Sequence, residues 1–155
     1  MSSLLRASLI ILALLSTAAC TSKAVVTPDR TLAPNLHADQ EQVKQAILTT
    51  LVKRQWSVQR VGPDLVQAQI TVRGQFHAEI DIPYTADHYQ IRYRDSREMN
   101  YKDGKIHKNY NRWVRLLDKG ILNELRDAQA KVTAKNLANG VATDAMPLQS
   151  GQMLH

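Results

Sequence analysis

The middle of the chain alternates apolar and polar residues at regular spacings, from Asp39 to about Lys131. The first element is predicted to be a helix, because Asp39 and Gln42 have the spacing of a capping box and apolar residues follow three and four positions apart. This helix is expected to end near Arg54. Its apolar stripe consists of Val43, Ile47, Thr50 and Leu51.

Four strands are predicted next, because apolar and polar residues alternate with a period of two in four successive segments. In the third segment Ala78 and Ile80 are expected to face the core, while His77 and Glu79 face outward. Short turn segments such as Gly62-Pro63-Asp64 separate the strands, which favours an antiparallel meander. The predicted strands cover residues 56–61, 65–72, 76–82 and 89–94.

A second amphipathic helix is predicted to start near Ile106 or His107. Its apolar stripe consists of Tyr110, Trp113, Val114, Leu117, Ile121, Leu125 and Ala128, opposite Arg112, Arg115, Lys119 and Arg126. Two amphipathic helices and a sheet with one apolar face predict an α+β fold. We expect a two-layer sandwich, in which a four-stranded antiparallel meander carries two helices on one face in the order α-β-β-β-β-α.

The two ends of the chain lack a sustained period. Residues 20–37 contain Pro28 and Pro34 among scattered polar groups, which predicts a flexible tether. Residues 38–134 are expected to form the α+β domain, and residues 135–155 a disordered tail.

Residues 1–19 predict a signal peptide, because the single cation Arg6 precedes an apolar core from Leu9 to Leu15. Small residues then precede Cys20, the only cysteine of the chain, which excludes intramolecular disulfides. Alternatives are ordinary secretion with a chance cysteine, or a retained membrane helix. The apolar run is shorter than the roughly 20 residues of a membrane span, which disfavours the second alternative.

The pattern around Cys20 resembles the lipobox of bacterial lipoproteins, although Thr17 stands where that family most often has leucine. The resemblance implies that Cys20 carries acyl chains such as palmitate and becomes the first residue of the mature chain. Thr21 and Ser22 follow it, rather than the aspartate linked to inner-membrane retention. The expected location is therefore the periplasmic face of the outer membrane, with the lipid on Cys20 as membrane anchor.

The chain has 20 Lys and Arg against 14 Asp and Glu, a formal net charge of +6. A basic surface favours anionic partners. In the periplasm these are phosphorylated lipid, anionic glycan or an acidic protein surface, and no nucleic acid is expected.

Few residues suggest chemistry. His77, Glu79 and Asp81 share one face of a strand and could hold a cation, but pairing of the carboxylates with Arg92 and Arg94 on the next strand is the preferred interpretation. We therefore predict no metal and no cofactor. Since no nucleophile with a matching base and no glycine-rich phosphate loop stands out, we also predict no enzymatic activity.

The segment 93–113 combines aromatic, amide and basic residues. Its rings Tyr101, Tyr110 and Trp113 could hold the loop on the sheet, with Ser96, Asn100 and His107 satisfying backbone groups. This structural interpretation is preferred, but the segment could also form a binding surface, in which aromatic rings meet a partner and cations meet phosphate or carboxylate groups. The candidate binding residues are Arg94, Arg97, Tyr101, Lys102, Lys105, Lys108 and Arg112.

The same segment looks like a group of uncharacterised short outer-membrane lipoproteins of proteobacteria. The similarity extends from about Gln42 to Leu125, and it implies the order of elements and an envelope location. Its most specific part reads Tyr93-Arg-Asp-Ser, Met99-Asn-Tyr, Lys105-Ile-His and Asn109-Tyr-Asn-Arg-Trp.

Two functions are expected from these observations. The first is a non-catalytic outer-membrane lipoprotein that binds another envelope protein in assembly or maintenance of the cell envelope. The alternative is a binder of an anionic glycan or lipid, such as peptidoglycan or lipopolysaccharide, through the basic aromatic loop 94–113.

Overall fold

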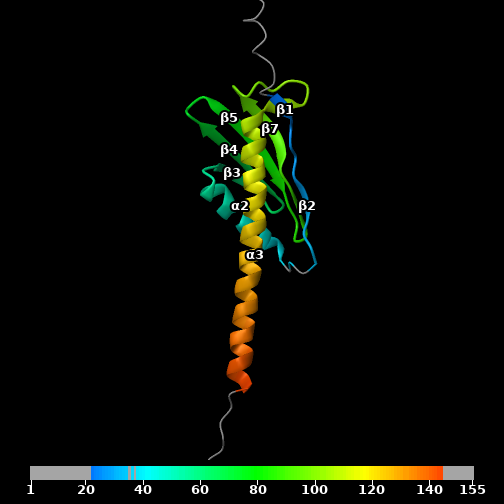
Figure 1. The fold of residues 1–155 in the computed structure, drawn as a ribbon, viewed down its shortest axis with the longest axis vertical. Helices are drawn as coiled ribbons and strands as arrows, with labels where there is room; N and C mark the ends of the chain where they lie inside the picture. Colours follow the sequence, from blue (N-terminus) through cyan, green and yellow to red (C-terminus); the bar gives the residue numbers. More distant parts are fainter. Residues whose placement is uncertain (1–21, 35, 37, 145–155) are drawn as a thin grey trace, which may run out of the picture.

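The protein has an α+β fold with two helices and antiparallel sheets (Figure 1). The computed structural model describes residues 22–34, 36 and 38–144; the predicted signal peptide, Cys20 and residues 145–155 lie outside them. None of the helices in the described residues has the length and apolar content that a membrane crossing requires. In chain order the elements are β1 (Ser22–Ala24), β2 (Asp29–Thr31), α2 (Gln40–Lys53), β3 (Ser57–Val61), β4 (Leu65–Val72), β5 (Phe76–Pro83), β6 (His88–Gln90), β7 (Arg92–Arg97), β8 (Lys105–His107) and α3 (Lys108–Asp144).

Helix α2 begins and ends as its sequence predicts. The Asp39 side chain accepts a hydrogen bond from the Gln42 backbone N–H, and the Gln42 side chain accepts one from the Asp39 N–H, which completes the capping box. Arg54 forms the C-cap. The predicted apolar stripe is buried, including the hydroxyl residue Thr50, which donates to the Ala46 carbonyl oxygen.

Strands β3, β4, β5 and β7 form a four-stranded antiparallel sheet in that order. The predicted alternation holds in its central strands, where Val66, Ala68, Ile80 and Ile82 are fully buried. These side chains belong to one continuous core that also contains the apolar faces of α2 and α3. A strong period-two pattern therefore identified the paired strands.

The fourth predicted strand, residues 89–94, is divided in the structure. Strand β6 pairs with β2 instead of continuing along β5, and the Ile91 N–H donates to the Pro28 carbonyl oxygen at 2.8 Å. Strand β7 then pairs with β5. The division arises because a segment from the start of the chain supplies hydrogen-bond partners that the local pattern does not contain.

The prediction of a flexible tether over residues 20–37 is wrong for the segment that includes β1 and β2. Strand β1 pairs with β8, and β2 pairs with β6, both antiparallel. Leu32 is part of the buried core. The folded domain therefore already includes Ser22, well before residue 38, and the predicted order α-β-β-β-β-α lacks β1, β2 and β8.

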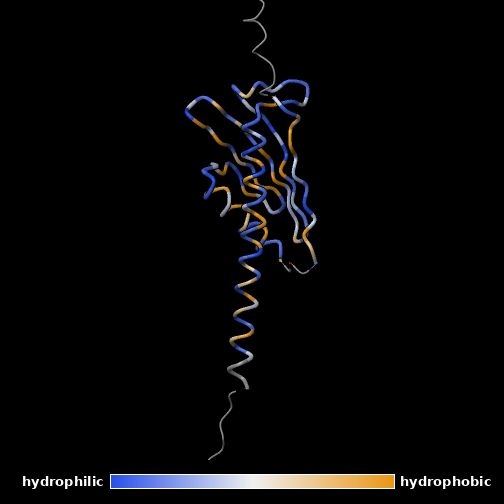
Figure 2. The backbone as a smooth tube through the Cα atoms, viewed as in Figure 1, coloured by the Kyte–Doolittle hydropathy of each residue, from blue (hydrophilic) through white to orange (hydrophobic). Residues whose placement is uncertain are grey.

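Helix α3 starts at Lys108, because residues 106 and 107 belong to β8. It has 37 residues, so it is about 55 Å long, and it extends well beyond the sheet (Figure 1). The expectation of disorder from residue 135 is wrong as far as Asp144, since these residues are helical. Figure 2 shows that polar and apolar residues alternate in the projecting half of α3.

Candidate functional site

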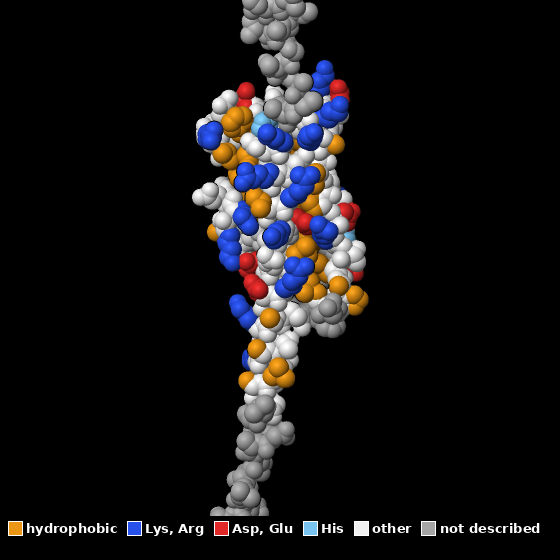
Figure 3. All heavy atoms as spheres, viewed as in Figure 1, with side chains coloured by type: hydrophobic (Ala, Val, Ile, Leu, Met, Phe, Trp, Pro, Cys, Tyr) orange, Lys and Arg blue, Asp and Glu red, His pale blue; other side chains and the backbone are white. Residues whose placement is uncertain are grey.

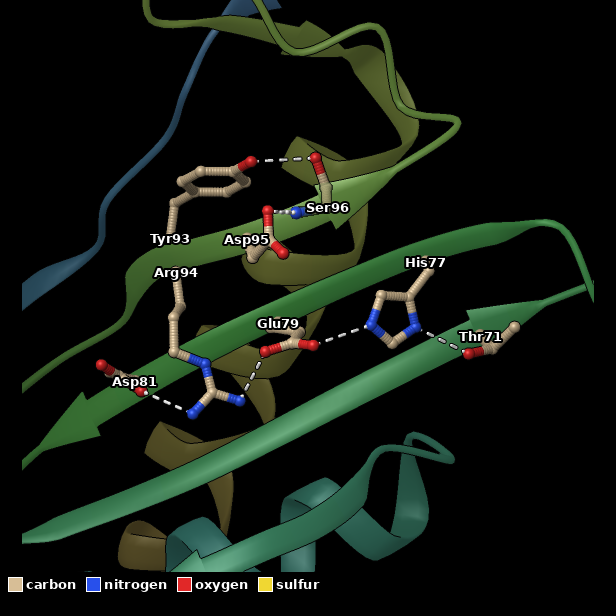
Figure 4. Close-up of polar contacts among 8 residues, drawn as sticks. All are labelled: Thr71, His77, Glu79, Asp81, Tyr93, Arg94, Asp95 and Ser96. Atoms are coloured by element: carbon tan, nitrogen blue, oxygen red, sulfur yellow. Dashed lines mark hydrogen bonds and ion pairs between the residues drawn. The ribbon is translucent and has the colours of Figure 1, made fainter.

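The polar face of the sheet carries a chain of charged contacts between β4, β5 and β7 (Figure 4). A bulge in β7 leaves Arg94 without a partner residue in β5. The Arg94 guanidinium lies 2.8 Å from a Glu79 carboxylate oxygen and 3.4 Å from an Asp81 oxygen. The predicted cross-strand ion pairing is therefore confirmed for Arg94, whereas Arg92 bonds to the Gln90 side chain.

His77 joins this network although it was expected to face outward; only 4% of it is exposed. Its Nε2 lies 3.0 Å from Glu79 Oε1, and its Nδ1 lies 2.9 Å from the Thr71 hydroxyl oxygen. A neutral imidazole that donates from Nε2 and accepts at Nδ1 satisfies both contacts. The hydrogen bond from His77, assisted by Arg94, lowers the pKa of the Glu79 carboxyl below its ordinary value.

The geometry of this network fits a structural role better than catalysis. A hydroxyl, an imidazole and a carboxylate do line up, but the carboxylate of Glu79 is already neutralised by Arg94 and is poorly placed to stabilise an imidazolium. Within the described part of the chain, no three His, Cys, Asp or Glu side chains are arranged to hold a metal ion. The network ties three neighbouring strands together.

Replacing Glu79 by glutamine is expected to destabilise the protein by about 1 kcal/mol at pH 7. A carboxyl group whose pKa is lower in the folded than in the unfolded protein stabilises the folded state. This stabilisation is complete at pH values above the pKa of the unfolded state, and it is lost as the pH falls through the pKa of the folded state. The difference between wild type and Glu79→Gln should therefore shrink as the pH falls below the ordinary value of 4.5. Urea unfolding from pH 7 to pH 3 measures it.

The exposed Glu98 supplies the matched control, because its side chain makes no ion pair in the described residues. Glu98→Gln should keep the wild-type stability at pH 7. A Glu79→Gln deficit that stays constant across the pH range would contradict the assignment of the charged contacts.

Three tyrosines of segment 93–113 form a compact cluster. The Tyr93 and Tyr101 rings stack with centroids 4.4 Å apart, and Tyr110 meets Tyr93 edge-on at 5.6 Å. Tyr110 is fully buried, and burial raises the pKa of its hydroxyl. Trp113 is half-buried against the core. The contacts of Tyr101 and Tyr110 with Tyr93 on β7 agree with the structural interpretation of these two rings, while Tyr101 keeps 47% of its surface exposed.

The predicted backbone contacts of the loop are only partly as expected. His107 Nδ1 accepts from the Asn109 N–H at 3.3 Å, but the Ser96 hydroxyl bonds to the Tyr93 hydroxyl rather than to backbone. The side chain of Asn111 binds the backbone at and just after β1. Its amide oxygen accepts from the Val26 N–H, and its amide nitrogen donates to the Ala24 carbonyl oxygen. Nothing in the local sequence distinguished Asn111, because its partners lie about 85 residues earlier in the chain.

The predicted binding cations separate into two groups. Arg94 is held in the sheet network. Lys102 and Lys105 face each other across a tight turn, in which Asp103 and Gly104 have φ of 50° and 70°, the conformation of a type I′ hairpin turn. The second group is exposed and forms no ion pair in the described residues. It consists of Lys102 and Lys105 together with Arg97, Lys108 and Arg112.

A second ionic cluster was not predicted from the sequence. Asp118 on α3 is 6% exposed and binds the Arg30 guanidinium through two contacts of 2.6 and 3.0 Å. It also accepts a hydrogen bond from the buried Tyr89 hydroxyl at 2.8 Å. Burial raises the pKa of the Tyr89 hydroxyl, and the negative charge of Asp118 is the second cause of this increase. This cluster joins β2, β6 and α3.

A shallow groove of about 350 Å³ separates α2 from the neighbouring part of α3. Its walls include Gln45 and Ala46 from α2, and Glu124, Asp127 and Ala128 from α3. The exposed Val132 follows Ala128 by four residues, so it continues this side of α3 beyond the groove. No protein-family model and no curated protein matches the chain. The roles of this groove and of the exposed cations are therefore inferred from their geometry.

Proposed function

We propose that this chain is a non-catalytic lipoprotein of the periplasmic face of the outer membrane, and that it binds another envelope protein in assembly or maintenance of the envelope. The lipid on Cys20 is its anchor. The folded part is proposed to be a two-layer sandwich with both helices on one face of the four-stranded sheet.

The projecting part of α3 carries the proposal. Leu125 is the last α3 residue in the buried core of the described chain, yet the helix continues to Asp144. Most helical stability in proteins comes from tertiary packing of an apolar face, and this segment contributes no side chain to the described core. Val132 and Leu137 are 43% and 66% exposed. A partner that packs against this segment and the adjoining groove would bury apolar surface that the monomer leaves in water.

Photo-crosslinking in the native envelope tests the proposal. A probe at Val132, and one at Gln45 on the opposite wall of the groove, should each give a discrete protein adduct. A control probe at the exposed Gln59, on the edge strand β3, should give none. The protein-binding proposal would be overturned if neither groove probe captured a protein, or if all three captured the same proteins.

The second candidate is binding of an anionic glycan or lipid through loop 94–113. The observation that favours it is the exposure of Lys102, Lys105, Lys108 and Arg112 without a carboxylate partner in the described residues. A probe at Lys102 distinguishes the two candidates, because an adduct of glycan or lipid at this position without protein adducts from the groove would favour the second.

A further inference from the structure

Five cations line the outer side of α3 along its packed part. We call them the basic stripe: Lys108, Arg112, Arg115, Lys119 and Arg126. At 100° per residue they fall within a sector of about 60°, and they extend along about 27 Å of helix. All five are exposed. On this side of the molecule Lys and Arg outnumber Asp and Glu (Figure 3).

The charge of the stripe is not neutralised within the protein. None of the five forms an ion pair with a carboxylate in residues 22–34, 36 and 38–144. The two acidic residues in this part of α3 point elsewhere: Asp118 binds Arg30, and Glu124 lies 2.6 Å from Lys53. Five like charges in a narrow sector repel one another, and a polyanion that covers them would offset this repulsion.

The stripe begins beside the proposed lipid anchor. Strand β1 pairs Ser22 with His107, the residue directly before Lys108. Cys20 precedes Ser22 by two residues, which span at most about 7 Å. An acyl chain on Cys20 therefore keeps the first turn of α3 at the membrane surface, whereas the tether expected from the sequence would have let the domain move away.

We propose that the basic stripe lies on the phosphate groups of the anionic membrane leaflet in which Cys20 is anchored, with α3 parallel to the membrane. This inference rests on the anchor of the proposed function and adds an orientation to it. A membrane fits better than a small ligand, because the cations lie in a row along a helix, whereas the pocket between the β2 segment and α3 has just Arg126 of the five in its lining. The groove between α2 and α3 then stays open to the periplasm.

The test uses the full chain, purified from membranes and reconstituted into vesicles of zwitterionic lipid with or without phosphatidylglycerol. Acylation blocks Cys20, so one introduced cysteine takes a fluorescent label. Asn123→Cys places it beside Lys119 and Arg126, and Gln59→Cys places it on β3 as the control. With quenchers on the lipid headgroups, the Asn123→Cys label should be quenched in anionic vesicles and released by high salt, and the Gln59→Cys label should stay bright.

Two variants that lose the same number of positive charges separate the effect of the basic stripe from the effect of the protein's net charge. Changing all five stripe residues to glutamine should abolish the quenching of the Asn123→Cys label. A control variant that carries the same change at Arg54, Arg60, Arg73, Lys131 and Lys135, all exposed, should keep it. Equal quenching at both label positions, or equal loss in both charge variants, would overturn the proposal.

The anchor is checked separately by the mass of the purified chain. A chain without acyl groups on Cys20 would refute the anchor of the proposed function. The stripe is then tested by flotation of the same protein with anionic vesicles, where the stripe variant should bind at least about tenfold more weakly than the control variant. Equal flotation of the stripe variant and the control variant would refute membrane binding by the basic stripe. Binding of the stripe to an acidic protein alone would refute it as well.

Discussion

Replacing Asp118 by alanine is expected to destabilise the folded protein by about 3 kcal/mol, more than any other polar substitution considered for this chain. The change removes both carboxylate contacts to Arg30 and the side-chain acceptor of the Tyr89 hydroxyl. Tyr89 is fully buried, so its hydroxyl would keep only the longer contact of 3.3 Å to the backbone carbonyl oxygen of Asp118. Urea denaturation gives the free energy of unfolding, and hydrogen exchange shows whether β2 (Asp29–Thr31) opens first.

Two further variants show how much of the loss in stability comes from the hydrogen bond between Tyr89 and Asp118. Tyr89→Phe alone should cost about 1 kcal/mol, because it removes a hydroxyl and its hydrogen bond together. In the Asp118→Ala background the same change should cost less, since the Tyr89 hydroxyl then has only the 3.3 Å contact to the backbone carbonyl oxygen at position 118. Additive losses in the double variant would show that the hydrogen bond between these residues contributes nothing.

Replacing Gly120 by alanine is expected to destabilise the protein by about 2 kcal/mol, even though alanine favours the helix by about 1 kcal/mol. A Cβ atom on Gly120 would lie 2.5 Å from the Thr50 Cγ2 atom, where α2 meets α3. Thr50 cannot easily turn away, because it is buried and its hydroxyl donates to the Ala46 carbonyl oxygen. The helices must therefore separate, and the fall in melting temperature measures the cost.

A second substitution should relieve the contact. Thr50→Ser removes the Cγ2 atom and keeps the hydroxyl, so the double variant should recover most of the stability lost in Gly120→Ala. Gly140→Ala is the control on the same helix, because a Cβ atom there meets nothing within 4 Å. If Gly140→Ala and Gly120→Ala destabilised the protein equally, the loss would come from the helix backbone and not from the contact with Thr50.

Both substitutions bear on the proposed binding surfaces. The groove between α2 and α3 requires the close approach at Gly120, so Gly120→Ala should also reduce the crosslinks from Val132 and Gln45. Asp118 holds β2 on α3, and β2 follows the strand that begins near Cys20. Loss of this contact would loosen the attachment of β2 to the rest of the domain.

The sequence alone was sufficient for the elements whose side chains repeat with a clear period. Helix α2 was predicted to its caps, because Asp39 and Gln42 act on neighbouring backbone groups. Strands β4 and β5 were predicted because one of their faces is buried, which imposes a period of two. The ion pair of Arg94 with Glu79 followed from the pairing of adjacent strands.

Only the tertiary structure decided the contacts between distant segments. Strands β1 and β2 have three residues each, too few for a period to be detected, and their hydrogen bonds come from β8, β6 and Asn111. The projecting end of α3 lacks the apolar stripe by which a helix is recognised. The sequence therefore predicted a basic domain on a long tether, whereas the pairing of Ser22 with His107 places the start of a basic helix beside the proposed lipid anchor.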